Sequence, residues 1–332
     1  MPRSLAALLV FFMAFAPLAS QAAQDGGSAE YSLPFGQHVP ETAARRVART
    51  TAWLEALERT TEALSAASLV RWGVGEVSDR RALVSAAFTP IVRNELKGQQ
   101  VFVQVRLSTP QRTVEDRLRK LLHDREMLKL RTEMLALERE KAGEARALIE
   151  KPSVWRRIMS GRRAVNSERI VLLADQLEAL WRLGSILPER EGGRWRDPQA
   201  TLAALQQTTA LDPDYATLWY LLGEVLLQLD RPLDAITELN KALALRPELA
   251  GALYARGLAY LRLQLPTLAE RDLSAALARD ASYAAWWRAR GALRMVRNET
   301  GLMCEDFMQA CARGDCEGLA VARERGLCQA EQ

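Results

Sequence analysis

Two consecutive stretches of equal length decide the fold: ATLWYLLGEVLLQLDRPLDAITELNKALALRPEL over residues 216–249 and AGALYARGLAYLRLQLPTLAERDLSAALARDASY over residues 250–283. Each stretch is 34 residues long, and the same residue types recur at the same places in both. The matched positions are Tyr220 and Tyr254, Gly223 and Gly257, Ala235 and Ala269, Leu239 and Leu273, and Ala242 and Ala276. A repeat of this length predicts helical pairs stacked along the chain.

Glycine recurs inside the predicted helices at the same interval, as Gly223, Gly257 and Gly291. A glycine within a helix costs about 1 kcal/mol relative to alanine, so a regular series of them needs a packing reason. We predict that each glycine lies where two helices approach most closely, opposite an alanine of the second helix.

The pattern resembles the tetratricopeptide repeat (TPR) family, on the residues Trp219-Tyr220-Leu221-Leu222-Gly223, Asp234-Ala235 and Leu245-Arg246-Pro247. The resemblance covers residues from about 198 to 313 and implies a mainly α fold. A degenerate repeat ending at Pro213 precedes the two clear ones, and a third begins at Ala284 with Met303 in the alanine position. Glu317–Arg325 predicts a closing helix, because the last repeat of a stack would otherwise expose its apolar face.

The resemblance also implies a binding groove, since the first helices of successive TPR units line a concave surface. We expect this groove to hold a partner peptide or protein, with tyrosines and apolar residues for an apolar anchor and arginines for a carboxylate. The alternative is that the tyrosines only pack against neighbouring helices. The lysine and asparagine clamp of some family members is absent. By register, the residues facing the groove are Tyr220, Glu224, Leu227, Gln228, Tyr254, Leu258, Leu261, Arg262, Arg288 and Met295.

All four cysteines follow residue 303. Their spacing favours disulfides over a zinc site, because zinc would need two close pairs of ligands and the sequence has no histidine nearby. Cys304 and Cys311 lie two turns apart on one helix, too far for a bond that needs α-carbons within about 7 Å. A turn after Cys311 brings it beside Cys316, which leaves Cys304 for Cys328. This nested pairing predicts a stapled C-terminal cap, and the cluster resembles the cysteine-stapled ends of exported helical-repeat proteins.

The chain has 332 residues, 48% of them hydrophobic, and a net charge of +4, with no basic block that would suggest nucleic acid. Arg3, the apolar run Leu5–Leu18 and Ser20-Gln21-Ala22 predict a cleaved signal over residues 1–22. A membrane anchor is the alternative, but the run is shorter than the roughly 20 residues that span a bilayer. We therefore expect an exported protein of the bacterial periplasm or cell envelope, without a membrane span after cleavage.

Residues 23–108 predict a small α+β module. Residues 23–40 contain several glycines and prolines and are expected to be an extended arm or linker. A helix after Glu41, a short helix near Arg80–Phe88, and strands at Ile91–Leu96 and Val101–Leu107 with a turn at Lys97-Gly98 should follow. The order of these elements faintly resembles N-terminal domains of bacterial envelope and flagellar-assembly proteins.

Residues 109–151 predict one long helix, from Val114 to Glu150. It carries two apolar stripes on nearly opposite sides, and the partner positions of the first are too polar for a good dimeric coiled coil. Either both stripes pack within the chain, or one joins another subunit; the protein would then be a structural component of an envelope assembly. The stripes are Leu121, Leu128, Leu135, Ala142 and Ile149, and Met127, Leu130, Met134 and Leu137.

Residues 152–197 are expected to connect the long helix to the repeats at 198–332. Arginines at 156, 157, 162 and 163 could touch an anionic membrane surface, or they could face water on a connecting helix. A further helix is predicted from Ser167-Glu168, followed by a surface loop between Pro188 and Pro198.

We expect no enzyme activity, no cofactor and no metal. The histidines, His38 and His123, neighbour no arrangement of nucleophile and carboxylate, and Gly73-Val74-Gly75 lacks the remainder of a phosphate-binding loop. Glu138 and Glu140 are expected on a solvated face of the long helix.

Overall fold

The computed structural model describes residues 27–36, 39–63, 77–108, 125–150, 163–187, 190–191 and 193–328. These residues fall into two compact units, which divide between Gly193 and Arg194. The predicted signal at 1–22, the start of the long helix at 114–124, the linker 152–162, both histidines and Gly73-Val74-Gly75 lie outside the described residues.

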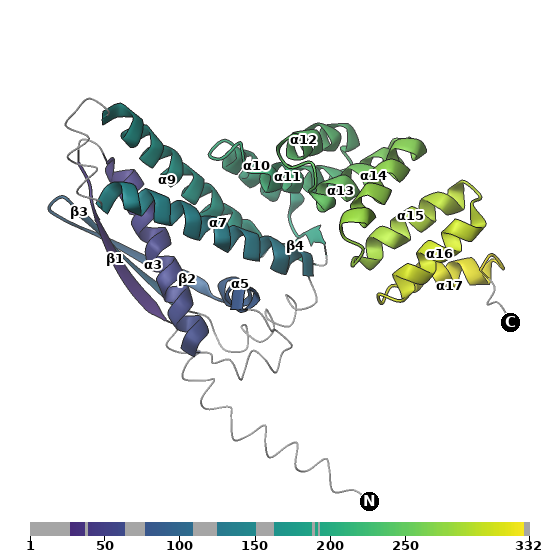
Figure 1. Cartoon of the computed structure of the whole chain (residues 1–332), viewed down its shortest axis with the longest axis horizontal. Coiled ribbons are helices and arrows are strands. Elements are labelled where there is room, and N and C mark those ends of the chain that lie inside the picture. Colours follow the sequence, from purple (N-terminus) through teal and green to yellow (C-terminus); the bar gives the residue numbers. More distant parts are fainter. Residues whose placement is uncertain are drawn as a thin grey trace, which may run out of the picture. The chain divides into compact units, whose positions relative to one another are not determined.

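The first unit packs helices against an antiparallel sheet of three strands in the order β1-β3-β2 (Figure 1). Val101, Val103 and Val105 of the central strand β3 are fully buried, and they share one core with α3, α7 and α9. The elements of this unit are β1 (Ser28–Pro34), α3 (Glu41–Ala63), α5 (Val77–Ala87), β2 (Thr89–Lys97), β3 (Gln100–Ser108), α7 (Arg125–Glu150), α9 (Arg163–Ile186) and β4 (Arg190–Glu191).

Strand β1 corrects the expectation of an arm over residues 23–40. It pairs antiparallel with β3, with Ala29 opposite Val105 and Leu33 opposite Val101. Ala29 and Leu33 are buried while their neighbours along the strand are more exposed, as in a strand with one face on a core. The free edge of β3 decides this pairing, because its backbone groups need partners.

The remaining elements of the first unit lie close to their predicted places. The hairpin β2–β3 turns at Gly98, whose φ of +61° suits glycine. Helix α3 begins at Glu41, as expected, and α9 begins at Arg163, four residues before the predicted Ser167. The short strands β4 and β5 lie where only a loop was expected.

Most of the described residues of both apolar stripes of helix α7 are buried within its own chain. Leu135, Ala142 and Ile149 are at most 7% exposed and belong to the core shared with the sheet. On the second stripe Leu130 is 5% exposed and Met134 is fully buried. Contacts inside the chain therefore occupy most of the surface that a second subunit would need.

The second unit is a succession of helical hairpins, coloured from green to yellow in Figure 1. Each first helix packs mainly against the helix that follows it, in the pairs α11/α12, α13/α14 and α15/α16. This arrangement confirms the predicted mainly α class. The elements are β5 (Arg194–Trp195), α10 (Pro198–Thr209), α11 (Ala216–Gln228), α12 (Pro232–Leu245), α13 (Ala250–Arg262), α14 (Pro266–Arg279), α15 (Ala284–Val296), α16 (Thr300–Cys311) and α17 (Glu317–Glu324).

The recurring glycines lie at close helix contacts, but their partners differ from the prediction. Each faces a leucine or phenylalanine four residues beyond the alanine position, because the missing side chain makes room for a large one. A Cβ atom added to the glycine would lie 2.5 Å from Cγ of Leu239 at Gly223, 2.9 Å from Cγ of Leu273 at Gly257, and 2.7 Å from Cδ1 of Phe307 at Gly291.

Each first helix ends in the same left-handed turn. Asp230, Gln264 and Asn298 have φ values of 56°, 58° and 58° and are spaced 34 residues apart. In each case the next residue's N–H donates to a carbonyl five residues back, at 2.9 Å, which satisfies a carbonyl at the helix end. The backbone conformation at these three positions therefore repeats every 34 residues, although the side chains there differ.

A buried ion pair also recurs with the repeat. The Arg256 guanidinium donates to both carboxylate oxygens of Asp272, at 2.6 and 3.1 Å, and Nη1 donates to Asn240 at 2.8 Å. One repeat later, Arg290 makes the same contacts to Asp306 and Ser274. Each arginine thus links its own second helix to the second helix of the preceding pair.

Both disulfides of the predicted nested pairing are present. Cys304 is bonded to Cys328 and Cys311 to Cys316, with α-carbons 5.6 and 4.0 Å apart. The first bond fixes the residues after α17 to α16, where Cys328 packs with Met303, Phe307 and Leu319.

Removing the outer disulfide should loosen the C-terminal cap before the repeats. A Cys304→Ser/Cys328→Ser variant opens a loop worth about 3–4 kcal/mol by chain entropy, whereas the short Cys311–Cys316 loop is worth about 2 kcal/mol. We expect hydrogen exchange of α17 to accelerate in the first variant, with α11–α14 unchanged. The matched Cys311→Ser/Cys316→Ser variant should show a smaller effect, and uniform acceleration across all the repeats would contradict this prediction.

Candidate functional site

The ten residues predicted to line a groove lie on α11, α13 and α15, and we call this surface the first-helix face. Its residues are Tyr220, Glu224, Leu227, Gln228, Tyr254, Leu258, Leu261, Arg262, Arg288 and Met295. The structure shows which of them already contact their own chain.

On α11 the first-helix face is closed by contacts within the unit. Tyr220 is 2% exposed, its hydroxyl donates to Glu224 at 2.8 Å, and its ring packs against Gly251 of the next first helix. Gln228 exchanges two hydrogen bonds with the backbone of Trp195, at 2.7 and 2.8 Å. Contacts within the unit therefore account for both residues. For Tyr220 this agrees with the alternative that the tyrosines only pack against neighbouring helices.

On α13 and α15 the polar residues of this face are also engaged. Arg262 donates to the backbone carbonyl of Leu227. Arg288 pairs with Asp315 at 2.8 Å and with Glu317 at 2.6 Å, on either side of Cys316. Both arginines therefore already have partners within their own chain.

Apolar surface remains accessible on these two helices. Leu258, Leu261 and Met295 are partly exposed, and Val296, which follows Met295 on α15, is 79% exposed. Tyr254 is also partly exposed and stacks on Trp286, with ring centroids 5.2 Å apart. The exposed side chains of this portion are therefore mainly apolar.

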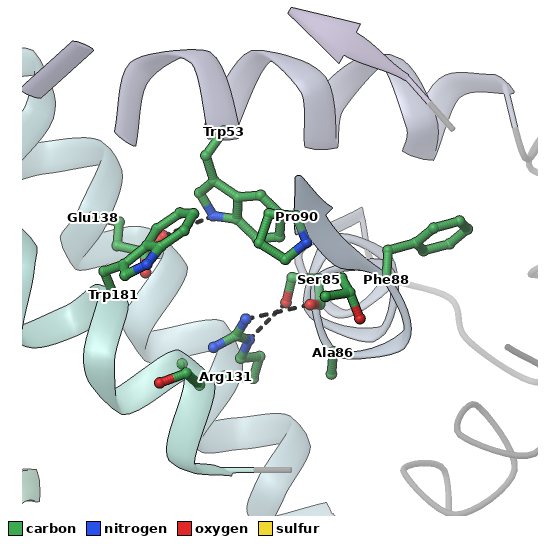
Figure 2. Close-up of a pocket in the computed structure, with 11 residues that line it drawn as sticks. Trp53, Ser85, Ala86, Phe88, Pro90, Arg131, Glu138 and Trp181 are labelled. Atoms are coloured by element: carbon green, nitrogen blue, oxygen red, sulfur yellow. Dashed lines mark hydrogen bonds between the residues drawn. The ribbon is translucent and has the colours of Figure 1, made fainter. Parts of the chain in front are cut away.

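The first unit contains a pocket of about 420 Å³ that sequence reasoning missed (Figure 2). Helices α3, α5, α7 and α9 and the start of β2 contribute to its wall. The lining residues are Trp53, Ser85, Ala86, Phe88, Thr89, Pro90, Arg131, Glu138, Trp181, Gly184 and Ser185.

A basic and an acidic side chain, Arg131 and Glu138, are buried in the lining of this pocket, and the burial of Glu138 corrects the prediction that it is solvated. Glu138 is 3% exposed and accepts a hydrogen bond from Trp53 Nε1 at 3.2 Å. Burial raises the pKa of its carboxyl, against the opposing effects of Arg131, the Trp53 hydrogen bond and Arg49. Burial lowers the pKa of Arg131, which is 7% exposed and still a cation at neutral pH.

Specific neighbours hold Arg131 and Glu138 in place. Arg131 Nε donates to Ser85 Oγ at 2.8 Å, and a Cβ on Gly184 would lie 2.6 Å from its Nη1. Trp53 meets Trp181 edge to face, with ring centroids 5.9 Å apart. Figure 2 shows Glu138 beside the two tryptophans and Arg131 beside Ser85.

A signal for these charges exists in the sequence. Met127, Arg131, Met134 and Glu138 follow the 4-3-4 spacing of one helix face. Arg131 lies between two methionines of this face and Glu138 one turn beyond the second, so the pattern places both on an apolar face.

The described residues contain no helix with the length and apolar character needed to cross a membrane. Nor do they bring together three or more histidine, cysteine, aspartate or glutamate side chains as a metal site would.

The recurring hairpins, glycine contacts and left-handed turns define the second unit as a TPR array. In agreement, a family model described as TPR repeat matches residues 234–264. No curated protein sequence matches the chain.

Solved structures of TPR proteins are similar to parts of the chain. PilF of Pseudomonas aeruginosa is 13% identical, with 58% of this chain and 89% of that chain covered and a TM-score of 0.38. MamA from Desulfovibrio magneticus RS-1 is 16% identical, with 52% and 96% covered and a TM-score of 0.36. The second TPR of Spaghetti (RPAP3), bound to an HSP90 peptide, is 23% identical, with 33% and 97% covered and a TM-score of 0.29. All three TM-scores are below 0.5, and none of these likenesses carries an inference about a partner.

Proposed function

We propose that the protein is an exported adaptor that binds a partner protein through the α13–α15 portion of the first-helix face. The contrast within that face supports this proposal. On α11, Gln228 and Tyr220 contact the chain's own Trp195 and Gly251, whereas Leu258, Leu261 and Met295 of α13 and α15 stay partly exposed and Val296, next to Met295 in sequence, is 79% exposed. Accessible apolar side chains on a rigid helical scaffold suit an apolar anchor of a partner segment.

Export is part of the proposal because of the disulfides. Every cysteine that the structure describes is in a disulfide bond, and disulfides persist in oxidising compartments such as the bacterial periplasm. The predicted signal at 1–22 agrees with this location.

Site-specific crosslinking in the producing cell tests the binding face. A photo-crosslinking amino acid at Val296 should form a defined adduct with a partner protein. The same amino acid at Leu233, which is 68% exposed on the second helix α12, should not.

The adduct must also depend on the neighbouring apolar residues. Leu258→Glu/Leu261→Glu should reduce the Val296 adduct at least about tenfold, because burying a charge without a partner opposes docking. An adduct that persists in this variant, or that is equal from Leu233, would refute the proposed face.

A further inference from the structure

The pocket of the first unit is lined by a buried arginine and a buried glutamate that form no direct ion pair with each other. In the part of the chain that the structure describes, no ion pair within 4 Å joins Arg131 to Glu138, and their hydrogen bonds go to Ser85 and Trp53. Buried charges usually pair with each other or with a bound group, because desolvation is costly. Two buried charges facing one cavity therefore point to a ligand that carries both complements.

Each charged group also has bonding capacity left toward the cavity. Arg131 uses Nε and Nη2 on Ser85, and its Nη1 donates to none of the described residues. Glu138 accepts the Trp53 indole on Oε2, and its Oε1 has no hydrogen-bond partner among the described residues. Both groups lie in the lining of the same pocket.

The rest of the wall suits an apolar body. Trp53, Trp181 and Pro90 provide rings, and a volume of about 420 Å³ is within the range of roughly 300–1,000 Å³ typical of small-ligand sites. The absence of a side chain at Gly184 makes room for the Arg131 guanidinium, whose Nη1 lies 2.6 Å from where a Cβ would stand.

The positions of Arg131 and Glu138 along α7 select the kind of zwitterion. Arg131 and Glu138 are seven residues apart on α7, so their backbones are separated by roughly 10 Å along the helix axis. A free α-amino acid carries its carboxylate and ammonium on one carbon, and it cannot reach both groups as well as a molecule with a peptide unit between them. We propose that the pocket binds a small peptide, such as an apolar dipeptide, with its carboxylate on Arg131 and its ammonium on Glu138.

Calorimetric titration of the full chain with leucyl-phenylalanine at neutral pH tests this site. We expect the free dipeptide to bind at least about tenfold more tightly than its N-acetyl form, its C-terminal amide or either free amino acid, since each of those lacks one charge-assisted contact or the required span. Absence of binding at millimolar concentration would overturn the proposal and leave only water in the pocket.

Variants distinguish the two contacts. Glu138→Gln keeps an acceptor for Trp53 and should bind free and N-acetyl dipeptide equally, about tenfold more weakly than the wild type binds the free form. Arg131→Gln should likewise remove the preference for the carboxylate over the amide. Glu140→Gln and Arg139→Gln, at neighbouring exposed positions on α7, should bind as the wild type does.

A folding defect is separable from loss of the site. If Arg131→Gln does not fold, Gly184→Ala tests the same guanidinium by crowding it from α9, and it should weaken the free dipeptide and the N-acetyl form equally. Wild-type selectivity in Glu138→Gln, or equal affinity of the wild type for the free and both blocked dipeptides, would overturn the proposal. The outcome of the crosslinking test of the first-helix face does not depend on whether the pocket binds a dipeptide.

Discussion

Replacing Asp306 by alanine should destabilise the second unit by about 3–5 kcal/mol, the usual cost of removing one partner from a buried ion pair. Asp306 is 1% exposed and accepts hydrogen bonds from Arg290 at 2.8 and 3.0 Å and from Arg294 at 2.9 Å. The alanine variant would leave two arginines, both mostly buried, without their carboxylate.

Urea denaturation of the oxidised protein measures this loss, and hydrogen exchange of α15 and α16 assigns it to the second unit. The control is Asp234→Ala, which removes an ion pair to Arg231 whose side chains are both about half exposed. Exposed pairs contribute at most about 1 kcal/mol. If both variants changed the unfolding free energy equally, burial would not govern the strength of these pairs.

Replacing Gly257 by leucine should cost the array about 1–3 kcal/mol through overpacking. The added Cβ alone would lie 2.9 Å from Leu273 Cγ and 3.4 Å from the Ala269 carbonyl oxygen, and backbone cannot move as freely as a side chain. The same substitution at Gly301, which has nothing within 4 Å of the added Cβ on α16, should leave the stability unchanged or slightly higher.

A double variant checks the cause. Gly257→Ala/Leu273→Ala should lose less stability than the sum of the single changes, because the smaller residue at 273 relieves the contact with the added methyl group. Additive losses would show that the close approach does not limit packing at this position.

Much of the second unit could be predicted because a short repeat places every important contact near in sequence. The 34-residue interval places Gly257 at a close helix contact within one hairpin, although its partner is Leu273 and not the predicted alanine. The cysteine pairing follows from the same local geometry, since a helix excludes some partners and the turn after it supplies another. The ion pairs from Arg256 to Asp272 and from Arg290 to Asp306 were missed, although they repeat at the same interval.

The first unit was less predictable because its contacts join distant segments. Strand β1 exists because it pairs with β3, more than sixty residues later in the chain. Trp53, on a different helix and 85 residues away in sequence, donates a hydrogen bond to Glu138. Glu138, which the sequence predicted to be in water, therefore lines a buried pocket.

The sequence alone determined the helical periodicity, the repeat register and the cysteine-stapled cap, since these depend on spacings within one or two adjacent helices. Only the tertiary structure decided which residues of the first-helix face stay accessible and that Arg131 and Glu138 face one cavity. Burial depends on which distant segment covers a residue, as Trp195 covers Gln228, and no local pattern specifies that segment.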